Sequence, residues 1–101
     1  MLERNISNLI RIQASTYGCI LFRNSKGAFK NKKGAVYQYG LIADGSSDLI
    51  GIYNGRFVAF EVKQPGEKPS AAQSAFIAMV QKNGGIAGVL TSPDQVADFL
   101  K

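Results

Sequence analysis

Three residues able to do chemistry together flank one turn of the sequence. Asp48 opens a run of β-forming residues, and Glu61 and Lys63 close a second such run. Asn54-Gly55, the strongest two-residue hairpin signal, separates the two runs. Counting pairs back from this turn places Asp48 opposite Glu61, with Cβ atoms roughly 4.5 to 5.5 Å apart. Lys63 projects from the same face as Glu61, because strand side chains repeat every second residue.

Two facing carboxylates call for a cation. Mg²⁺ or Mn²⁺ suits them, since these hard ions take oxygen ligands and bridge to phosphate oxygens, and the backbone carbonyl of Val62 offers a further ligand. With an ammonium beside it, such an ion favours phosphodiester hydrolysis. The alternative is a solvated strand face with a weak cross-pair worth ~0 to 1 kcal/mol. We favour the catalytic interpretation, because Glu61 ends a strand that is otherwise apolar on both faces.

Hydrophobic periodicity and helix-capping residues predict the helices and strands that position these residues. A strand-helix-strand unit leads from Lys63 through a helix to a strand at 86–90, so those strands should be parallel with a right-handed crossover. The sequence therefore predicts an α/β (α+β) fold in the order α-β-β-β-α-β-α, with a mixed sheet of about four strands and flanking helices. The predicted elements are an amphipathic helix at 2–16, a buried strand at 19–22, the hairpin strands 48–53 and 56–63, a helix from Ser70 to about Asn83, the strand 86–90, and a final helix capped by Ser92.

Residues 25–46 show no sustained period, and a loop of this length in a small domain is usually functional, mobile or exchanged with a partner chain. Tyr37 and Tyr39 could stack on bases, although we favour the packed face of a short strand. The basic residues here have no acid among them and suit phosphate contacts, or else they only solubilise the loop. The candidate DNA-binding residues are Arg23, Lys26, Lys30, Lys32 and Lys33.

The amino-acid composition limits the possible fold classes and catalytic mechanisms. The chain has 101 residues, of which 46% are apolar and 19% charged, so we expect one globular domain spanning residues 1–101. It contains no histidine, which excludes Ser-His-Asp and Cys-His catalysis and imidazole-based zinc sites. The single cysteine, Cys19, lies in an apolar run and is expected in the core.

Charge and targeting signals point to a partner and a compartment. Twelve Lys and Arg against seven Asp and Glu give a net charge of +5, which indicates nucleic acid or else an ordinary basic protein. No apolar run approaches the ~20 residues of a membrane span, and no apolar region follows the first charges as in a secretory signal. We therefore expect a cytoplasmic protein without a membrane partner.

The order of motifs resembles a known family. Gly45-Ser46-Ser47-Asp48, then Glu61-Val62-Lys63, then Gln73 on the next helix resemble the PD-(D/E)xK nuclease superfamily, specifically its virus-type replication-repair nuclease (VRR-NUC) family. The resemblance covers nearly the whole chain and implies a restriction-endonuclease-like core. One departure is Ser47, which stands where the family often has a proline before the first acid.

The resemblance also implies roles. Asp48 and Glu61 would bind the metal with the Val62 carbonyl, and Lys63 would place the attacking water. Glu3 would contact the metal through a bound water. The alternative interpretation is that Glu3 only interacts with the positive end of the first helix. Gln73 would arrange Lys63 or the substrate. The spacing Ser70-Ala-Ala-Gln73 equally fits a capping box, and the two interpretations of Gln73 stay open.

Stand-alone members of this family resemble Holliday-junction resolvases, so the resemblance implies a Mg²⁺- or Mn²⁺-dependent DNA endonuclease. It would act as a homodimer on branched DNA, in DNA repair, in an intracellular setting of phage or bacterial type. The alternative from a different class is a non-catalytic, basic nucleic-acid-binding module with the same fold, in which Asp48 and Glu61 bind no metal.

Overall fold

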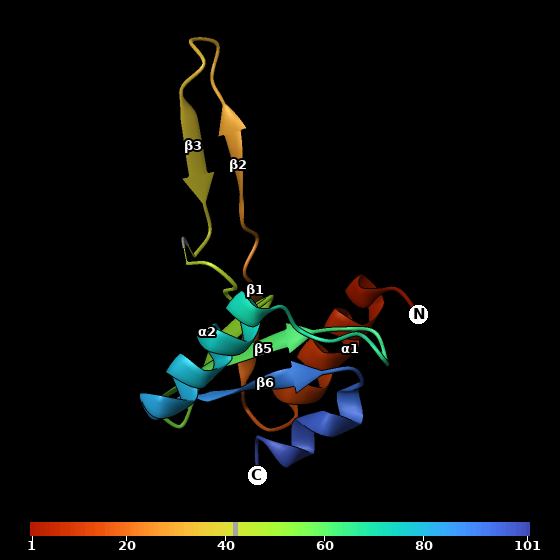
Figure 1. Ribbon diagram of the computed structural model, residues 1–101. Coiled ribbons are helices and arrows are strands. Elements are labelled where there is room, and N and C mark those ends of the chain that lie inside the picture. Colours follow the sequence, from red (N-terminus) through yellow and green to blue (C-terminus); the bar gives the residue numbers. More distant parts are fainter. Residues whose placement is uncertain (42) are drawn as a thin grey trace.

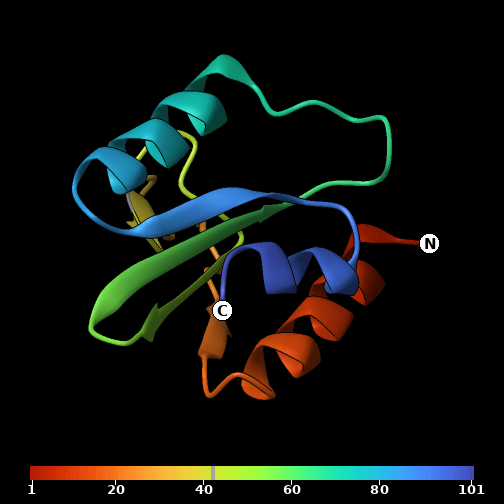
Figure 2. The same cartoon turned by 90° about the horizontal axis from the view of Figure 1, so that it is seen from below.

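The computed structural model describes residues 1–41 and 43–101. Its body is a four-stranded sheet in the order β1-β4-β5-β6, and Figure 2 shows this sheet between α2 on one side and α1 with η1 on the other. The mixed α+β architecture predicted from the sequence is thereby confirmed. The elements of the body are α1 (Glu3–Ser15), β1 (Ile20–Arg23), β4 (Leu49–Tyr53), β5 (Arg56–Val62), α2 (Ala71–Lys82), β6 (Ile86–Leu90) and the 3-10 helix η1 (Pro93–Asp98).

The central hairpin has the predicted register. Tyr53 pairs with Arg56 and Leu49 with Phe60 in an antiparallel ladder. The turn adopts positive φ at both Asn54 (50°) and Gly55 (76°), as a tight hairpin turn requires. Strand β6 pairs with β5 in parallel and β1 pairs with β4 antiparallel, so the sheet is mixed as expected.

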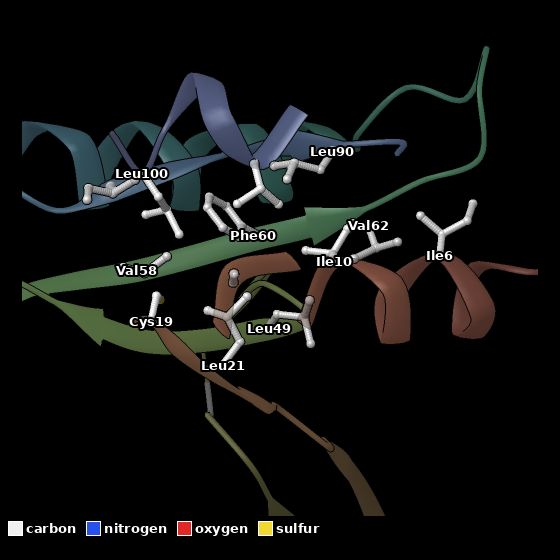
Figure 3. Packing of buried hydrophobic residues seen from close by; sticks show 13 residues of the cluster. Ile6, Ile10, Cys19, Leu21, Leu49, Val58, Phe60, Val62, Leu90 and Leu100 are labelled. Atoms are coloured by element: carbon white, nitrogen blue, oxygen red, sulfur yellow. The ribbon is translucent and has the colours of Figure 1, made fainter. Parts of the chain in front are cut away.

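Each face of the sheet carries its own apolar cluster. The larger cluster joins α1, η1 and the inner face of the sheet, and Figure 3 shows Ile10 of α1 among Leu49 and Phe60 from adjacent strands. The smaller cluster packs Phe76 and other residues of α2 on the opposite face. Cys19 is fully buried in the larger cluster, which confirms the prediction for it. Because β5 contributes to both clusters, its side chains are buried on both faces at the strand's end.

Two local predictions need correction. Strand β1 is not a buried strand: Leu21 is buried, but Ile20 and Phe22 are 63% and 61% exposed, because β1 lies at the sheet edge with only one covered face. The final helix is a 3-10 helix rather than an α-helix, although its predicted capping box at Ser92 forms and Val96 is buried. In the part of the chain described, no helix is long and apolar enough to cross a membrane.

A second, two-stranded sheet stands apart from the body. Strands β2 (Gly27–Lys30) and β3 (Val36–Tyr39) form an antiparallel hairpin that projects away from the body in Figure 1. We call residues 26–40 the arm. The long loop without sustained period predicted for 25–46 therefore contains a hairpin, whose first strand was not predicted. The short strand predicted for Tyr37 and Tyr39 exists, but both side chains are about half exposed (50% and 49%), so it has no packed face.

Candidate metal centre

Strand β5 carries one acid into the interior. Glu61 is only 2% exposed and is preceded by Phe60, which lies in the larger core, while its own carboxyl hydrogen-bonds to that of Asp48. Its atom Oε1 is buried and has no hydrogen-bond partner among the described residues. A buried carboxylate oxygen without a hydrogen-bond partner costs free energy, so a ligand that contacts this oxygen would stabilise the folded protein.

Asp48 is brought to Glu61 by the hairpin and held by backbone groups. It lies one position before β4, and its Oδ2 accepts a hydrogen bond of 3.0 Å from the Val62 N–H across the hairpin. Its own carbonyl accepts a bond of 2.8 Å from the Asn24 N–H. The structure thus places Asp48, Glu61 and Val62 together at one end of the β4–β5 ladder, as the pairing count from the turn predicts.

The surroundings of Glu61 favour its protonated form. Burial, the hydrogen bond from Asp48 and the negative charge of Asp48 raise the pKa of Glu61 to about 8. The ammonium groups of Lys26 and Lys63 act in the opposite direction on this pKa but do not overcome the burial. A divalent cation between the carboxylates would replace the proton on Glu61.

The donor set fits a hard cation. Two carboxylates and a backbone carbonyl are oxygen donors of the kind that Mg²⁺ and Mn²⁺ select, and these ions complete their shell with water. Within residues 1–41 and 43–101, no group of three or more His, Cys, Asp or Glu side chains gathers closely enough to hold a metal. Any site here therefore depends on the Asp48–Glu61 pair and on donors other than a third acid.

Glu3 and Lys63 lie beside the pair rather than in it. Glu3 lies in the first turn of α1 and is largely exposed. Desolvation by its neighbours, a hydrogen bond to Glu67 and the negative charges of Glu67 and Asp48 raise its pKa, and the charge of Lys63 acts in the opposite direction. Lys63 therefore acts on Glu3, Glu61 and Glu67 at once. A cleft of about 220 Å³ opens here, lined by Glu3, Arg4, Ser7, Arg23, Asn24, Ser25, Asp48 and Val62.

Gln73 is engaged in the helix cap. Its Oε1 accepts from the Ser70 N–H at 2.8 Å, and its own N–H donates to the Ser70 hydroxyl at 3.1 Å, which confirms the capping box. Gly45, with φ of 74°, lies so close to the backbone of Ala72 that no side chain would fit. The loop that ends in Asp48 is thus held against the first turn of α2.

The structure separates the five predicted DNA-binding residues into three places. Arg23 lines the cleft and donates to Asn8 Oδ1 at 3.3 Å. The Lys26 ammonium donates to the Ser46 carbonyl and acts on Glu61, so it belongs to the surroundings of the carboxylates. The remaining three, Lys30, Lys32 and Lys33, are exposed on the arm.

Sequence reasoning missed Asn24, which is buried at the base of the arm. Its Nδ2 donates to Ser46 Oγ at 3.1 Å and to the Ser47 carbonyl at 2.9 Å, and its Oδ1 accepts from the Leu41 N–H at 3.0 Å. With its own N–H on the Asp48 carbonyl, Asn24 joins both ends of the arm to the loop that carries the first acid. No local pattern marks an asparagine for this role, because its partners lie 17 to 24 residues away.

Arg56 also has a function that the sequence did not indicate. Its guanidinium donates to the Gly84 carbonyl at 2.8 Å and to the Gly85 carbonyl at 3.4 Å. These bonds tie the turn after α2 to the start of β5, so Arg56 supports the strand that carries Glu61.

Comparison with known proteins identifies a solved structure with a similar fold. No family model and no curated protein matches the chain. A solved structure described as "VRR_NUC domain" superposes with a TM-score of 0.64 at 20% sequence identity, covering 95% of this chain and 90% of that one. The resemblance to the VRR-NUC family drawn from the motifs is confirmed at the level of the fold.

Proposed function

We propose that the chain is a divalent-metal-dependent endonuclease that hydrolyses DNA phosphodiester bonds and prefers branched DNA, in the manner of a Holliday-junction resolvase. The observation that carries the proposal is the buried Glu61, with one oxygen unpartnered and the other acid, Asp48, against it. A purely structural pair of surface acids would be solvated and would not raise a carboxyl pKa to about 8. A buried acid with a strongly raised pKa, in contact with an acid that lines a cleft, is typical of a functional site.

Each residue of the site has a role in this proposed reaction. Asp48, Glu61 and the Val62 carbonyl would hold Mg²⁺ or Mn²⁺, which when bound supplies positive charge to a substrate phosphate. The Lys63 ammonium would orient the attacking water and stabilise negative charge that develops on the phosphate. Its backbone is fixed for this by the bond from its N–H to the Leu90 carbonyl at 3.1 Å.

Glu3 and Gln73 would play supporting parts in the same site. Glu3 faces the cleft with Asp48 and would act on the metal side through water. Because Gln73 Oε1 is committed to Ser70, the part of Gln73 left for the substrate or for Lys63 is its amide nitrogen. This division lets the capping role and the proposed site role coexist.

The charge of the molecule supports DNA as the partner. Its net charge is +5, and Arg23 stands in the cleft beside Asp48 while lysines extend along the arm. We further propose that residues 1–101 act as one nuclease unit inside cells, and that two copies associate. A two-fold dimer presents two sites to two strands, as symmetric cutting of a four-way junction requires.

The proposal is tested by cleavage of labelled four-way junction, flap and linear duplex in Mg²⁺. Lys63→Ala should lower the single-turnover rate by about 10²- to 10³-fold, because it removes charge stabilisation at the reacting phosphate. DNA affinity should change less than about twofold, since a single phosphate-proximal charge contributes little to overall binding. Lys68→Ala, at an exposed lysine outside the cleft, is the matched control.

The same assay separates the rival functions. Unchanged cleavage in Lys63→Ala would contradict the mechanism. Tight DNA binding with no cleavage in either Mg²⁺ or Mn²⁺ would favour the non-catalytic binding module. A monomer in sedimentation that cuts flaps alone would retain the nuclease and remove the junction-resolving role.

A further inference from the structure

The arm has two chemically different faces. Phe29 pairs with Tyr37 and Gly27 with Tyr39, whereas Lys30 pairs with Val36. Because directly paired residues share a face and faces alternate along each strand, the three aromatic rings lie on one face and Lys30 lies on the other. The hairpin therefore separates a ring face, formed by Phe29, Tyr37 and Tyr39, from a lysine face.

The ring face is ordered and open. Phe29 and Tyr37 stack with ring centroids 5.5 Å apart and planes 23° from parallel. The Tyr39 ring lies across Gly27, where even a methyl side chain would meet its hydroxyl. All three rings stay about half exposed, and none belongs to either core cluster. The arm thus presents a surface of flat aromatic groups to solvent.

Two lysines stand at the tip of the arm in a fixed turn. Asn31 Oδ1 accepts from the N–H groups of Lys33 and Ala35, each at 2.9 Å, and the Asn31 N–H donates to the Ala35 carbonyl at 2.9 Å. These bonds hold Lys32 and Lys33 beyond the end of the ring face. The arm consequently carries positive charge at its tip and along its second face.

The positive charge of the arm indicates which kind of ligand it binds. No acid occurs between Asn24 and Ala43, while this stretch has four lysines, Lys26, Lys30, Lys32 and Lys33. Each copy of the chain has a net charge of +5, so a second copy offers the arm no complementary charge. A two-stranded ribbon alone in water is also marginally stable, so an exposed aromatic face is best explained by a ligand. That ligand must be anionic and offer flat apolar surfaces, which are the properties of unpaired nucleotides.

We propose that the arm binds unpaired nucleotides, with bases stacked on the ring face and neighbouring phosphates contacting Lys30, Lys32 and Lys33. This inference rests on the proposed nuclease function and gives its preference for branched DNA a physical basis, because branch points offer bases that are not stacked in a duplex. The base of the arm is bonded to the loop carrying Asp48 through Asn24 and Lys26. A strand held on the arm would therefore lie on the same side of the molecule as the carboxylates.

The test is equilibrium binding in EDTA, measured by fluorescence anisotropy. The probes are a labelled oligothymidylate of about a dozen nucleotides, within the usual site size, a blunt duplex, and the same duplex with an internal unpaired stretch. In the double variant Phe29→Val, Tyr37→Val, valine keeps a high strand propensity but removes the rings, so affinity for the probes with unpaired bases should fall about tenfold or more. Affinity for the blunt duplex should change less than about twofold.

Controls keep the result interpretable. Val36→Thr alters the opposite face at an equally exposed position and should bind like the wild type. The ladder of the arm is checked by amide NMR in each variant. A measurement on the wild type avoids mutation altogether: the chain has four tyrosines and no tryptophan, so oligothymidylate should quench tyrosine emission while the blunt duplex should not.

Several outcomes would overturn the inference. Equal losses on all three probes, no loss on any, or no quenching by oligothymidylate would each remove the base-stacking role. Conversion of a dimer to a monomer by the double variant, with binding unchanged, would assign the ring face to a second copy of the chain. Because binding is measured without metal, a failure here leaves cleavage by the wild type unaffected, and a failure of cleavage leaves this result standing.

Discussion

The carboxylate pair and the arm depart from the usual distribution of residues in opposite directions. In the body, a carboxylic acid, Glu61, is 2% exposed at the end of a core strand, where an apolar residue is expected. In the arm, Phe29 is 55% exposed on a strand with no covering layer, where a polar residue is expected. Both placements cost stability when the molecule is alone.

The comparison shows that the two regions require different ligands. The acid pair is complementary to a small, hard cation, because its unpartnered oxygen is shielded from solvent. The ring face is complementary to a large, flat ligand, because its surface is open and its surroundings are positively charged. Asn24 connects the two regions, since it bonds both ends of the arm to the loop that carries Asp48.

The largest effect on stability should come from that connection. Asn24→Ala removes three side-chain hydrogen bonds from a site that is 8% exposed, two of them to the fully buried Ser46 and Ser47. We expect the free energy of unfolding to fall by roughly 2 to 4 kcal/mol, measured by urea denaturation. Asn8→Ala, whose side chain accepts one exposed bond of 3.3 Å, should cost less than about 0.5 kcal/mol. Equal effects in both variants would mean that the arm and the body are not coupled through Asn24.

A second prediction concerns the pH dependence of stability in EDTA. The pKa of Glu61 is raised from 4.5 to about 8, so between these values the folded state keeps a proton that the unfolded state has lost. The free energy of unfolding should therefore fall as the pH rises through this range. Glu61→Gln cannot titrate, so its stability should change less and should exceed that of the wild type above about pH 8 by a few kcal/mol.

The measurement is urea denaturation of both proteins in EDTA across this pH range. Glu67→Gln is the matched control, because Glu67 is exposed and its pKa is lowered by the hydrogen bond from the Gln64 N–H and by Glu3. Parallel curves for the wild type and Glu61→Gln would show that Glu61 is ionised in the folded state, contrary to the geometry of the pair.

The smallest effect on stability should come from the arm. Replacing Lys30, Lys32 and Lys33 by Gln should change the free energy of unfolding by less than about 0.5 kcal/mol, because all three are exposed. The salt dependence of oligothymidylate binding should nevertheless weaken, with the slope of log K against log salt concentration reduced by about 2. An unchanged slope would show that these lysines make no phosphate contacts.

How far the sequence predicts this molecule depends on whether the information is local. Asn54-Gly55 fixes the hairpin and hence the meeting of Asp48 with Glu61, and Ser70 with Gln73 marks the start of α2, because each signal lies within a few residues. Strand β2 was not predicted and β3 was indicated only by its tyrosines, because both faces of these strands are exposed and no apolar alternation is required. Asn24 and the edge position of β1 depend on contacts between distant segments, which no local pattern encodes.

The central claim is that Asp48 and Glu61 together bind a divalent cation, and calorimetric titration with Mn²⁺ tests it most directly. The wild type should bind about one ion per chain, more tightly at pH 8 than at pH 6 because the Glu61 proton competes with the metal. Asp48→Asn and Glu61→Gln should abolish the heat, whereas Asp94→Asn, at an exposed acid of η1, should leave it unchanged. A flat titration of the wild type, or the same heat in Asp48→Asn, would contradict the account.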